Sequence, residues 1–399
     1  MKCNNKNILM ILQSEFPPDI RVEKEMKALT SERLNVFLLS NKKKDLPDQE
    51  EFSYGIVIRL KDVPFLGTAF NRKKNFPVPL NPFWLVSFVR VVFQKKIEVI
   101  HVHDLPFALL GIIGKVFFHK KFVLDLHENY PAALALWGKK GNIVSQIFRN
   151  PELAEIYEKW SLRFADAVIV VAPEHKAYLQ KKYDILPPIE VVGNTVEWGT
   201  YDRFPLDENI VQKYEKQFVL SFLGQFSPER DLDVAVKAVR FLKQEISNLK
   251  LIFVGDGVYR AQLQKWIEIE GVNDHVEIIG WVPFEETSSY LAVSDICIIP
   301  QGSNDLIDSG TPHKLFQYMA MGKPVLVSDA RAMKNVVEET RCGEVFRSRS
   351  AQDFAQAVLK IRNNADFPYG ENGVRAVQIK YNWQNSANVL RSLYKKIFS

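Results

Sequence analysis

The stretch around Thr311 has the residue types of a phosphate-binding helix start. Thr311 suits the N-cap of a helix predicted over 312–321, with Pro312 in its first turn and Gly310 directly before it. Free backbone amides and the positive end of the helix would then meet at one point, which favours an anion. The preceding residues 301–309 are polar and follow a buried strand. An ordinary capped helix without a ligand is the alternative.

Loops after two other predicted strands carry residues suited to the same chemistry. Gly224 ends an apolar run and leads to Arg230, whose planar guanidinium suits a diphosphate because it binds two oxygens at once. Gly255 and Asp256 follow the next apolar run, where a nucleotide-facing loop and a tight turn that needs glycine are equally good explanations. Arg230 could equally pair with a surface carboxylate, so each site keeps a structural alternative.

Histidines and carboxylates follow two predicted strands in the first half of the chain. His127 comes directly after the apolar run KFVLDL, and His101, His103 and Asp104 lie at the end of the run beginning at Val99. A histidine at such a position can donate a hydrogen bond to a substrate or move a proton. A structural role is the stronger explanation for any single one of them. Several polar groups at successive strand ends favour a shared site.

Several common signatures are missing from the sequence. No GxGxxG follows a strand and no GxxxxGK[ST] occurs, which argues against a Rossmann dehydrogenase and a P-loop enzyme. There is also no DxD pair for a metal and no GxSxG nucleophile motif. The three cysteines, Cys3, Cys297 and Cys342, form no CxxC pair and indicate neither disulfides nor zinc. We therefore predict no bound metal and no cofactor.

The elements that position these residues alternate between apolar strands and amphipathic helices. This alternation predicts parallel sheets with right-handed crossovers, whose ligands bind outside the carboxyl ends of the strands. The predicted strands are 7–13, 35–40, 99–103, 121–127 and 167–172 in the first half, and 218–224, 250–255, 276–280, 296–300 and 324–328 in the second. The predicted fold class is α/β, with two facing doubly wound, Rossmann-like domains.

Length and charge support this division. A chain of 399 residues is too long for one ordinary core, and the polar stretch 197–216 separates two sets of strands. We place the two domains at 1–198 and 199–380. The net charge is +5, and between residues 59 and 121 eleven basic residues stand against three acidic ones. This basic region indicates an anionic surface or substrate.

Four segments of the second half stand in a highly specific order. Their sequences are FLGQFSPERDLDVAVKAV, LIFVGDGVYRAQL, VEIIGWVPFEETSSYLAVSDICIIP and TPHKLFQYMAMGKPVLVSD. The first half adds PPDIRVEKEMKAL, VIHVHD, LDLHENYP and ADAVIVVA. Over nearly its whole length the chain resembles the GT-B glycosyltransferases, in particular glycosyltransferase family 4, also called the glycosyltransferase group 1 family.

The resemblance implies a retaining, metal-independent transferase that moves a sugar from a nucleotide-diphosphate sugar to a hydroxyl of a glycan or lipid-linked acceptor. It makes 1–198 the acceptor-side domain, 199–380 the donor-binding domain and 381–399 a helix packed back on the first domain. It matches His127, Arg230 and Lys314 to the catalytic centre. It matches Gly224, Gln225, Gly255, Asp256, Val282, Asp308, Ser309, Gly310, Thr311 and Gln317 to the donor, and Asp19, Arg21, His103 and Asp104 to the acceptor side.

The sequence departs from the family pattern at three positions. Gln225 stands where an arginine is expected, and the paired glutamates of the family fall at Ser309 and Gln317. Lys314 can compensate for the missing charge, and Asp305 or Asp308 can take over the sugar contact of the first glutamate. The departures leave two alternatives open. One is a nucleotide-sugar-binding partner of an active transferase that has itself lost transfer, and the other is a sugar-nucleotide epimerase.

The segment 64–96 alternates aromatic residues, Trp84 and Phe88 among them, with basic residues. This pattern is typical of a surface that lies on an anionic bilayer, although a core helix with solvent-facing lysines is the alternative. The apolar run 7–13 is too short for a signal peptide, and the longest apolar stretch, 105–118, is too short to span a bilayer. We expect a cytoplasmic protein, peripheral at the inner face of the membrane, that binds no nucleic acid.

Overall fold

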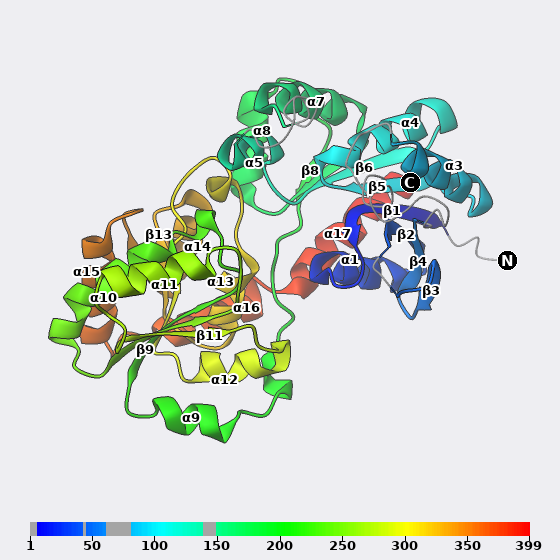
Figure 1. Ribbon diagram of the computed structural model, residues 1–399. Coiled ribbons are helices and arrows are strands. Elements are labelled where there is room, and N and C mark those ends of the chain that lie inside the picture. The colour runs from blue at the N-terminus through cyan, green and yellow to red at the C-terminus, as the bar shows by residue number, and fades with distance from the viewer. Residues whose placement is uncertain (1–5, 43–44, 61–80, 139–148) are drawn as a thin grey trace. The chain divides into compact units, whose positions relative to one another are not determined.

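The computed structural model describes residues 6–42, 45–60, 81–138 and 149–399 (Figure 1). By its internal contacts the chain divides into two compact units. Unit 1 comprises Met1–Val192 with Ser386–Ser399, and unit 2 comprises Gly193–Asn385. Each unit is built on one β-sheet of its own.

The sheet of unit 1 has the strand order β3-β4-β2-β1-β5-β6-β7-β8. Neighbouring strands pair in parallel, except that β3 and β4 form an antiparallel hairpin. The elements are β1 (Asn7–Glu15), α1 (Ile20–Thr30), β2 (Asn35–Asn41), β3 (Gln49–Phe52), β4 (Gly55–Arg59), α3 (Pro82–Gln94), β5 (Val99–His103), η1 (Leu105–Phe107), α4 (Ala108–Phe118), β6 (Lys121–Leu126), α5 (Tyr130–Trp137), α7 (Pro151–Phe164), β7 (Ala167–Val170), α8 (Pro173–Lys182) and β8 (Ile189–Val191).

The two faces of this sheet differ in chemistry because side chains alternate along a strand. On β5, Ile100 and Val102 belong to the apolar core that α3, α4 and α7 cover. The residues between and after them, His101 and His103, are also fully buried but point to the opposite face, toward α1 and the terminal helix α17 (Trp383–Phe398). The sheet therefore directs polar side chains into an enclosed layer.

Unit 2 has an all-parallel sheet in the order β11-β10-β9-β12-β13-β14. Its elements are η2 (Tyr201–Arg203), α9 (Glu208–Tyr214), β9 (Phe218–Leu223), η3 (Pro228–Arg230), α10 (Leu232–Glu245), β10 (Leu249–Val254), α11 (Arg260–Ile269), β11 (Val276–Gly280), η4 (Phe284–Glu286), α12 (Thr287–Ala292), β12 (Ile296–Ile299), η5 (Ile307–Ser309), α13 (His313–Ala320), β13 (Val325–Ser328), α14 (Arg331–Thr340), β14 (Gly343–Phe346), α15 (Ala351–Asn363) and α16 (Tyr369–Ile379).

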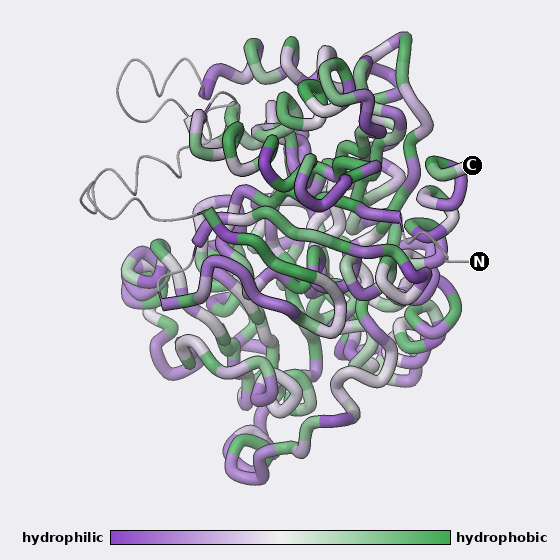
Figure 2. The backbone as a smooth tube through the Cα atoms, turned by 90° about the vertical axis from the view of Figure 1, so that its right-hand side faces the viewer, coloured by the Kyte–Doolittle hydropathy of each residue, from purple (hydrophilic) through white to green (hydrophobic). Residues whose placement is uncertain are grey.

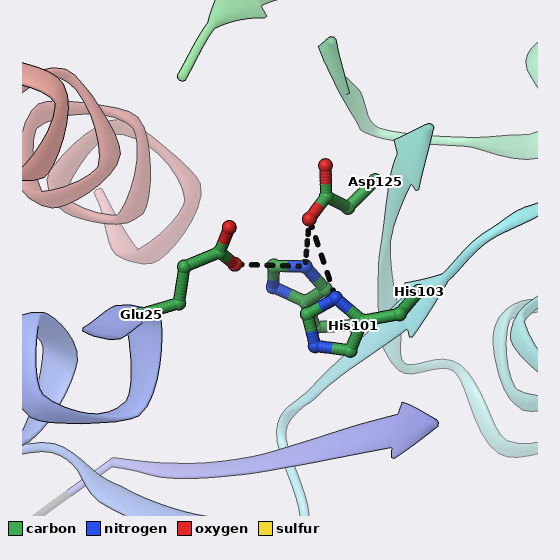
Figure 3. Close-up of side chains that lie close together, drawn as sticks. All are labelled: Glu25, His101, His103 and Asp125. Carbon is green, nitrogen blue, oxygen red and sulfur yellow. Dashed lines mark hydrogen bonds and ion pairs between the residues drawn. The ribbon is translucent and has the colours of Figure 1, made fainter. Parts of the chain in front are cut away.

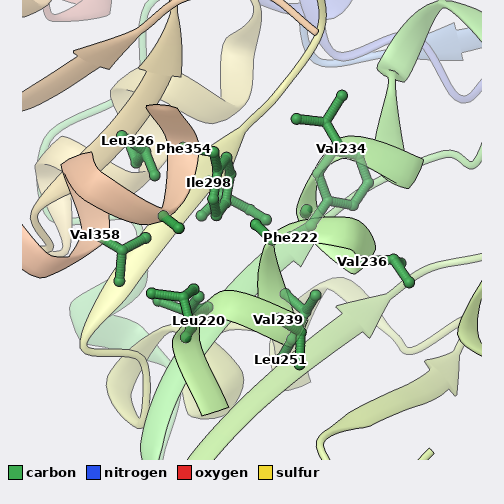
Figure 4. Packing of buried hydrophobic residues seen from close by; sticks show 14 of the residues in the cluster. Leu220, Phe222, Val234, Val236, Val239, Leu251, Ile298, Leu326, Phe354 and Val358 are labelled. Carbon is green, nitrogen blue, oxygen red and sulfur yellow. The ribbon is translucent and has the colours of Figure 1, made fainter. Parts of the chain in front are cut away.

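Helices cover both faces of this second sheet. On β9, Leu220 and Phe222 pack under α10 and α15 in the cluster of Figure 4, while Val219 and Leu223 belong to the core on the other face. Both faces of the strand are buried, which is why its sequence is a nearly continuous apolar run. The covering helices alternate between hydrophobic and hydrophilic stretches (Figure 2), as amphipathic helices on a sheet do.

The predicted fold class is confirmed: both sheets are the parallel α/β sheets expected from the sequence. Every predicted strand is present, but the hairpin β3–β4 and the strands β8 and β14 were not predicted. The prediction that Thr311 is the N-cap of α13 is wrong. Pro312 has an extended ψ of 144° and takes the N-cap position, so the helix begins at His313 and no side chain caps it.

Two strand-end loops of unit 2 touch backbone to backbone. Gly255, directly after β10, has a φ of +138°, and a Cβ on it would lie 2.1 Å from the carbonyl oxygen of Gly224 after β9. A side chain cannot fit there without moving one loop. Gly271 has a φ of +62° but has open space where a Cβ would stand.

We predict that Gly255→Ala lowers the free energy of unfolding of unit 2 by about 3 kcal/mol or more, because it adds a clash to backbone strain. Gly271→Ala, the matched control, should cost only about 1 kcal/mol from strain alone. Amide hydrogen exchange of peptides from β9 and β10, followed at increasing urea concentration, measures the free energy of unfolding of both variants. Equal losses in the two variants would contradict the close approach of the loops.

Candidate functional site

The carboxyl ends of four adjacent strands, β11, β10, β9 and β12, carry the residues that the sequence suggested for binding a phosphate. Strand β10 pairs with one side of β9, whereas β12, which comes later in the chain, pairs with the other side of β9. Such a reversal of strand order leaves a crevice at the strand ends, where ligands of open parallel sheets bind. Arg230 follows β9, and Lys314 stands in the first turn of α13 after β12.

The Lys314 side chain lies flat against the end of β9. Its Nζ is 3.7 Å from the centroid of the Phe222 ring, and a Cβ on Gly224 would be only 2.7 Å from it. Although Lys314 as a residue is only half-buried, its Nζ atom is enclosed and has no hydrogen-bond partner among the described residues. Burial, together with the neighbouring charge of Arg230, holds the pKa of Lys314 well below its ordinary value.

Arg230 ends the short helix η3 and is partly tied to the loop after β12. One terminal nitrogen donates a hydrogen bond of 2.6 Å to the side-chain oxygen of Gln301, while Nε is buried and has no partner in the described part of the chain. Burial also lowers the pKa of Arg230. Gln301 is neutral, so the bond orients the guanidinium without cancelling its charge.

Two half-buried basic side chains with enclosed, unpartnered nitrogen atoms thus meet at one point of the sheet. Buried charges are normally paired, because an unpaired one costs several kcal/mol of solvation. A diphosphate would supply both the missing negative charge and acceptors for the open nitrogen atoms. This arrangement fits an anionic ligand and gives no reason to expect a metal at this point, where positive charge is already in excess.

The other predicted donor-binding residues are distributed along the same loops. Asp256 accepts hydrogen bonds from the backbone of Gly257 and from Arg260, which matches the tight-turn alternative. Asp308 accepts from the Ser303 hydroxyl and from the backbone N–H of Arg331, so its carboxylate holds a loop against α14. Gln317 is half-buried one turn after Lys314.

The remaining members of the predicted set lie in the loops and core of unit 2. Ser309 and Thr311 are buried, the Ser309 hydroxyl donates to the backbone oxygen of Asp305, and Gln225 is exposed. Val282 packs partly buried against the core, and Gly310 follows η5. The donor-binding roles of all these residues stay predictions.

In unit 1, His127 lies between two carboxylates at the end of β6. Its Nε2 is 3.0 Å from Oδ2 of Asp125, and its Nδ1 is 3.5 Å from Oδ2 of Asp104. The backbone N–H of His127 also donates to Asp104. Burial alone would lower the pKa of His127, but Asp104 and Asp125 outweigh it and raise the pKa to about 9. His127 is therefore an imidazolium at neutral pH, with 19% of its side chain exposed.

Asp125 is the centre of a buried polar cluster (Figure 3). Arg21 of α1 contacts one of its oxygens at 3.0 Å, and Nδ1 of His103 lies 3.2 Å from the other. Burial would raise the pKa of Asp125, yet Arg21 and His127 hold it well below the ordinary value. Burial, with the nearby His101, lowers the pKa of His103 to about 3, so this imidazole is neutral.

Glu25, His101, His103 and Asp125 are residue types that bind metals, and one ligand atom of each lies within 4.8 Å of the others. However, the guanidinium of Arg21 already contacts both carboxylates, at 3.0 Å from Glu25 and 3.0 Å from Asp125. Arg21 and His127 therefore supply the positive charge that a metal would bring, and we assign no metal to this cluster.

The predicted acceptor-side residues have definite structural partners. Asp19 is the N-cap of α1, where its carboxylate accepts from the backbone N–H of Val22. Arg21 is buried and directed into the Asp125 cluster, which His103 also joins, while Asp104 contacts His127. Any contact of these four residues with an acceptor stays a prediction.

Three members of this cluster, Asp125, Glu25 and Tyr394, were not predicted. Asp125 is a carboxylate inside the apolar run KFVLDL, two positions before His127, and this spacing could have identified it because alternate residues share one face of a strand. Glu25 stands four residues after Arg21 on α1, which could have indicated the pair. Tyr394 contacts His101 from the other end of the chain, and no local pattern indicates it.

The predicted membrane-contacting segment 64–96 is described only from residue 81 onward. Here the prediction is wrong for Trp84 and Phe88, which are 1% and 0% exposed and form part of the core under α3. Burial of these two large side chains anchors α3 to the sheet. Phe93 at the end of α3 and Phe117 at the end of α4 are exposed instead, with Lys95, Lys96 and Lys121 close by in the chain.

Comparison with known proteins assigns the chain to one family. The family model "Glycosyl transferases group 1" matches residues 204–374, and "Glycosyltransferase Family 4" matches residues 21–197. An uncharacterized glycosyltransferase of Methanocaldococcus jannaschii is 24% identical, over 83% of this chain and 82% of its own length. In the part of the chain that the structure describes, no helix is long and apolar enough to cross a membrane.

Two solved structures illustrate the likeness in fold. Sucrose-phosphate synthase from Thermosynechococcus elongatus has a TM-score of 0.80 and 18% identity, with 99% of each chain covered. The Anabaena protein HepE, solved in complex with UDP-glucose, has a TM-score of 0.71 and 14% identity, with 98% of this chain and 99% of its own covered.

We predict that Lys314→Met raises the free energy of unfolding of the ligand-free protein by about 1 kcal/mol, because it removes a buried ammonium without a partner. The same change should abolish the rise in Tm that pyrophosphate gives the wild type. Differential scanning calorimetry with and without pyrophosphate measures both effects.

Lys323→Met is the matched control. Its Nζ is partly buried in the same unit but donates a 2.6 Å hydrogen bond to the backbone oxygen of Ala292. This control should lose stability and keep its response to pyrophosphate. A Lys314→Met protein that is less stable than the wild type and still responds to pyrophosphate would contradict the proposed anion site.

Proposed function

Because the chain belongs to the glycosyltransferase group 1 family, also called family 4, we propose that it is a retaining transferase whose unit 2 holds the donor sugar by its diphosphate. The observation that carries this proposal is the pair of basic side chains, Arg230 and Lys314, whose Nε and Nζ atoms are enclosed without a hydrogen-bond partner in the described chain. The complex of the structural neighbour HepE with UDP-glucose supports a nucleoside diphosphate sugar as the donor.

Arg230 and Lys314 then act on the leaving group. As the bond between the anomeric carbon and the phosphate oxygen breaks, negative charge develops on the diphosphate, and fixed cations stabilise that charge. The acceptor hydroxyl attacks from the same face, forms the new bond to the anomeric carbon and passes its proton to the departing phosphate oxygen. This sequence of events needs no metal and no covalent intermediate on the enzyme.

Unit 1 is proposed as the acceptor side, with His127 as its catalytic residue. Because Asp104 and Asp125 raise its pKa to about 9, the side chain is a cationic hydrogen-bond donor at neutral pH and cannot serve there as a general base. We propose that it binds a hydroxyl of the transferred sugar, which orients the sugar and favours charge build-up on the leaving diphosphate.

We propose that the acceptor is a glycan or a lipid-linked sugar, and that the enzyme is cytoplasmic and peripheral at the membrane. The exposed Phe93 and Phe117 on neighbouring helices support this, because the rings of Phe93 and Phe118 pack at 5.1 Å and so join α3 and α4. Lysines beside exposed aromatic side chains suit an anionic lipid surface.

The donor is tested with a panel of nucleotide sugars in the presence of EDTA. One of them should raise the Tm of the protein, and cleavage of its sugar–phosphate bond should proceed without added metal. Turnover should stay level near neutral pH and fall as the pH rises through about 9, because His127 then loses its proton. Radiolabelled sugar release against pH measures this.

His127→Gln serves as the control in this assay, because glutamine can donate a hydrogen bond but carries no charge. It should keep the donor-induced rise in Tm and lose turnover by on the order of a hundredfold. A wild type that binds the donor but never cleaves it would favour the alternative of a non-catalytic partner, and interconversion of the sugar would favour an epimerase. Activity lost to EDTA and restored by magnesium would overturn metal independence.

Membrane contact is tested by cosedimentation with vesicles that contain anionic lipid. The wild type should bind at low salt and bind less at high salt, because ionic strength screens the lysines. Replacing Phe93 and Phe117 together by serine should reduce the bound fraction several-fold. Ile269→Ser, which removes an exposed apolar residue from unit 2, is the control and should bind like the wild type. A wild type that stays in the supernatant at both salt concentrations would exclude this surface.

A further inference from the structure

We infer that Tyr394, on the terminal helix α17, is a positioning residue for His127 and acts on it through His101 and Asp125. The inference rests on the catalytic role proposed above for His127. Tyr394 is nearly 270 residues from His127 in the sequence and does not touch it in the structure. Its effect must therefore pass through the buried cluster.

The first contact joins Tyr394 to His101. The Tyr394 hydroxyl is 2.7 Å from Nδ1 of His101, and both side chains are buried to 1% exposure or less. The two rings are nearly parallel, at 18°. Burial, together with the charges of Glu25 and Asp125, raises the pKa of Tyr394 well above its ordinary value, so the phenol keeps its proton.

The Asp125 carboxylate on the far side of His101 fixes the direction of this hydrogen bond. Nε2 of His101 faces Oδ2 of Asp125 at 3.6 Å and Oε2 of Glu25 at 3.7 Å (Figure 3). Burial, together with Asp125, raises the pKa of Glu25 to about 8, so the negative charge on this side is that of Asp125. A lone pair on Nε2 would be repelled by Oδ2 of Asp125, whereas an N–H is attracted to it. His101 is neutral, because burial lowers its pKa, so Nε2 holds its single proton and Nδ1 accepts from Tyr394.

The second contact joins His101 to His127 through one carboxylate oxygen. Oδ2 of Asp125 is the oxygen that His101 faces, and it is also 3.0 Å from Nε2 of His127. Arg21 donates to the other oxygen at 3.0 Å and to Oδ2 itself at 3.3 Å. If Tyr394 no longer donates, the His101 proton can move to Nδ1, and a lone pair then faces Oδ2. Asp125 would shift away from it and weaken its contact with His127.

The charged and titratable groups around His127 come from several elements. Asp104 and Asp125 contact it directly, and His103 lies 3.1 Å from its Nε2. Behind them stand Arg21 and Glu25 from α1, His101 from β5 and Tyr394 from α17, and Glu128 is the next residue in the chain. Among the described groups that surround His127, Tyr394 is the contribution of the terminal helix.

The experiment compares Tyr394→Phe with the wild type by NMR titration of the histidine side chains. Removing the hydroxyl should lower the titration midpoint of His127 by roughly half a pH unit and change the nitrogen shifts of His101 to those of a mixed tautomer. In the transfer assay kcat should fall on the order of fivefold while the KM for the donor stays constant. The His127→Gln spectrum identifies the His127 signal.

Tyr183→Phe is the matched control. It removes a hydroxyl of unit 1 that donates a hydrogen bond of 2.7 Å to Oε2 of Glu158. This hydrogen bond lies outside the Asp125 cluster. It should change neither the His127 titration nor kcat. His101→Asn interrupts the same path one step closer to His127. Combining it with Tyr394→Phe should lower the His127 titration midpoint and kcat little more than either single change, because both act through one path.

A Tyr394→Phe protein with a lower Tm, an unchanged His127 titration and unchanged kcat would show a merely structural role and overturn the inference. The NMR titration needs no substrate. A protein without transferase activity would therefore refute the proposed function and still leave the path from Tyr394 to His127 open to test. If Tyr394→Phe does not fold, the His101→Asn titration decides.

Discussion

The fold of unit 2 has to hold two basic side chains, Arg230 and Lys314, whose enclosed nitrogen atoms have no hydrogen-bond partner in the described chain. Water would solvate such charges far better than the end of a sheet does, so the arrangement persists only because the surrounding core is rigid. Glycine at position 224 leaves the space that the Lys314 ammonium occupies, and Gln301 orients Arg230 without neutralising it. Hydrophobic packing on both faces of the sheet stabilises the unit and offsets the solvation free energy that these two side chains lose. The binding of an anion would compensate for this loss.

Unit 1 handles charge in the opposite way. Its cations, Arg21 and His127, are paired with Asp125 and Asp104 within the unit itself. The cluster is therefore complete before any ligand arrives, and its internal contacts set the protonation state of His127. Unit 2 needs negative charge from a ligand, whereas unit 1 contains a histidine whose charge is already set by its neighbours. Both follow from placing charged groups in an environment of low polarity.

The sequence predicted the parts of this molecule that depend on local pattern. Buried strands such as β7 and β9 are apolar runs, and glycines or polar residues mark the strand ends, so the fold class and the position of Arg230 could be predicted. Thr311 was misplaced by one residue, because the φ of proline suits both the N-cap and the first turn. Glu25 and Tyr394 could not be found in this way, because their roles depend on which helices cover the second face of the sheet. Such long-range contacts have no period in the sequence.

The composition of unit 1 from two separate segments has a consequence for synthesis on the ribosome. Residues 193–385, which form the whole of unit 2, emerge before Ser386–Ser399, which complete unit 1. Until then Leu390 and Tyr394 are missing from the face where His101 lies, and this face stays open to water. Unit 2 can fold as an uninterrupted segment, while unit 1 has to wait for residues 386–399 to emerge. A nascent chain that stalls before residue 386 would thus carry a folded anion site beside an unfinished partner.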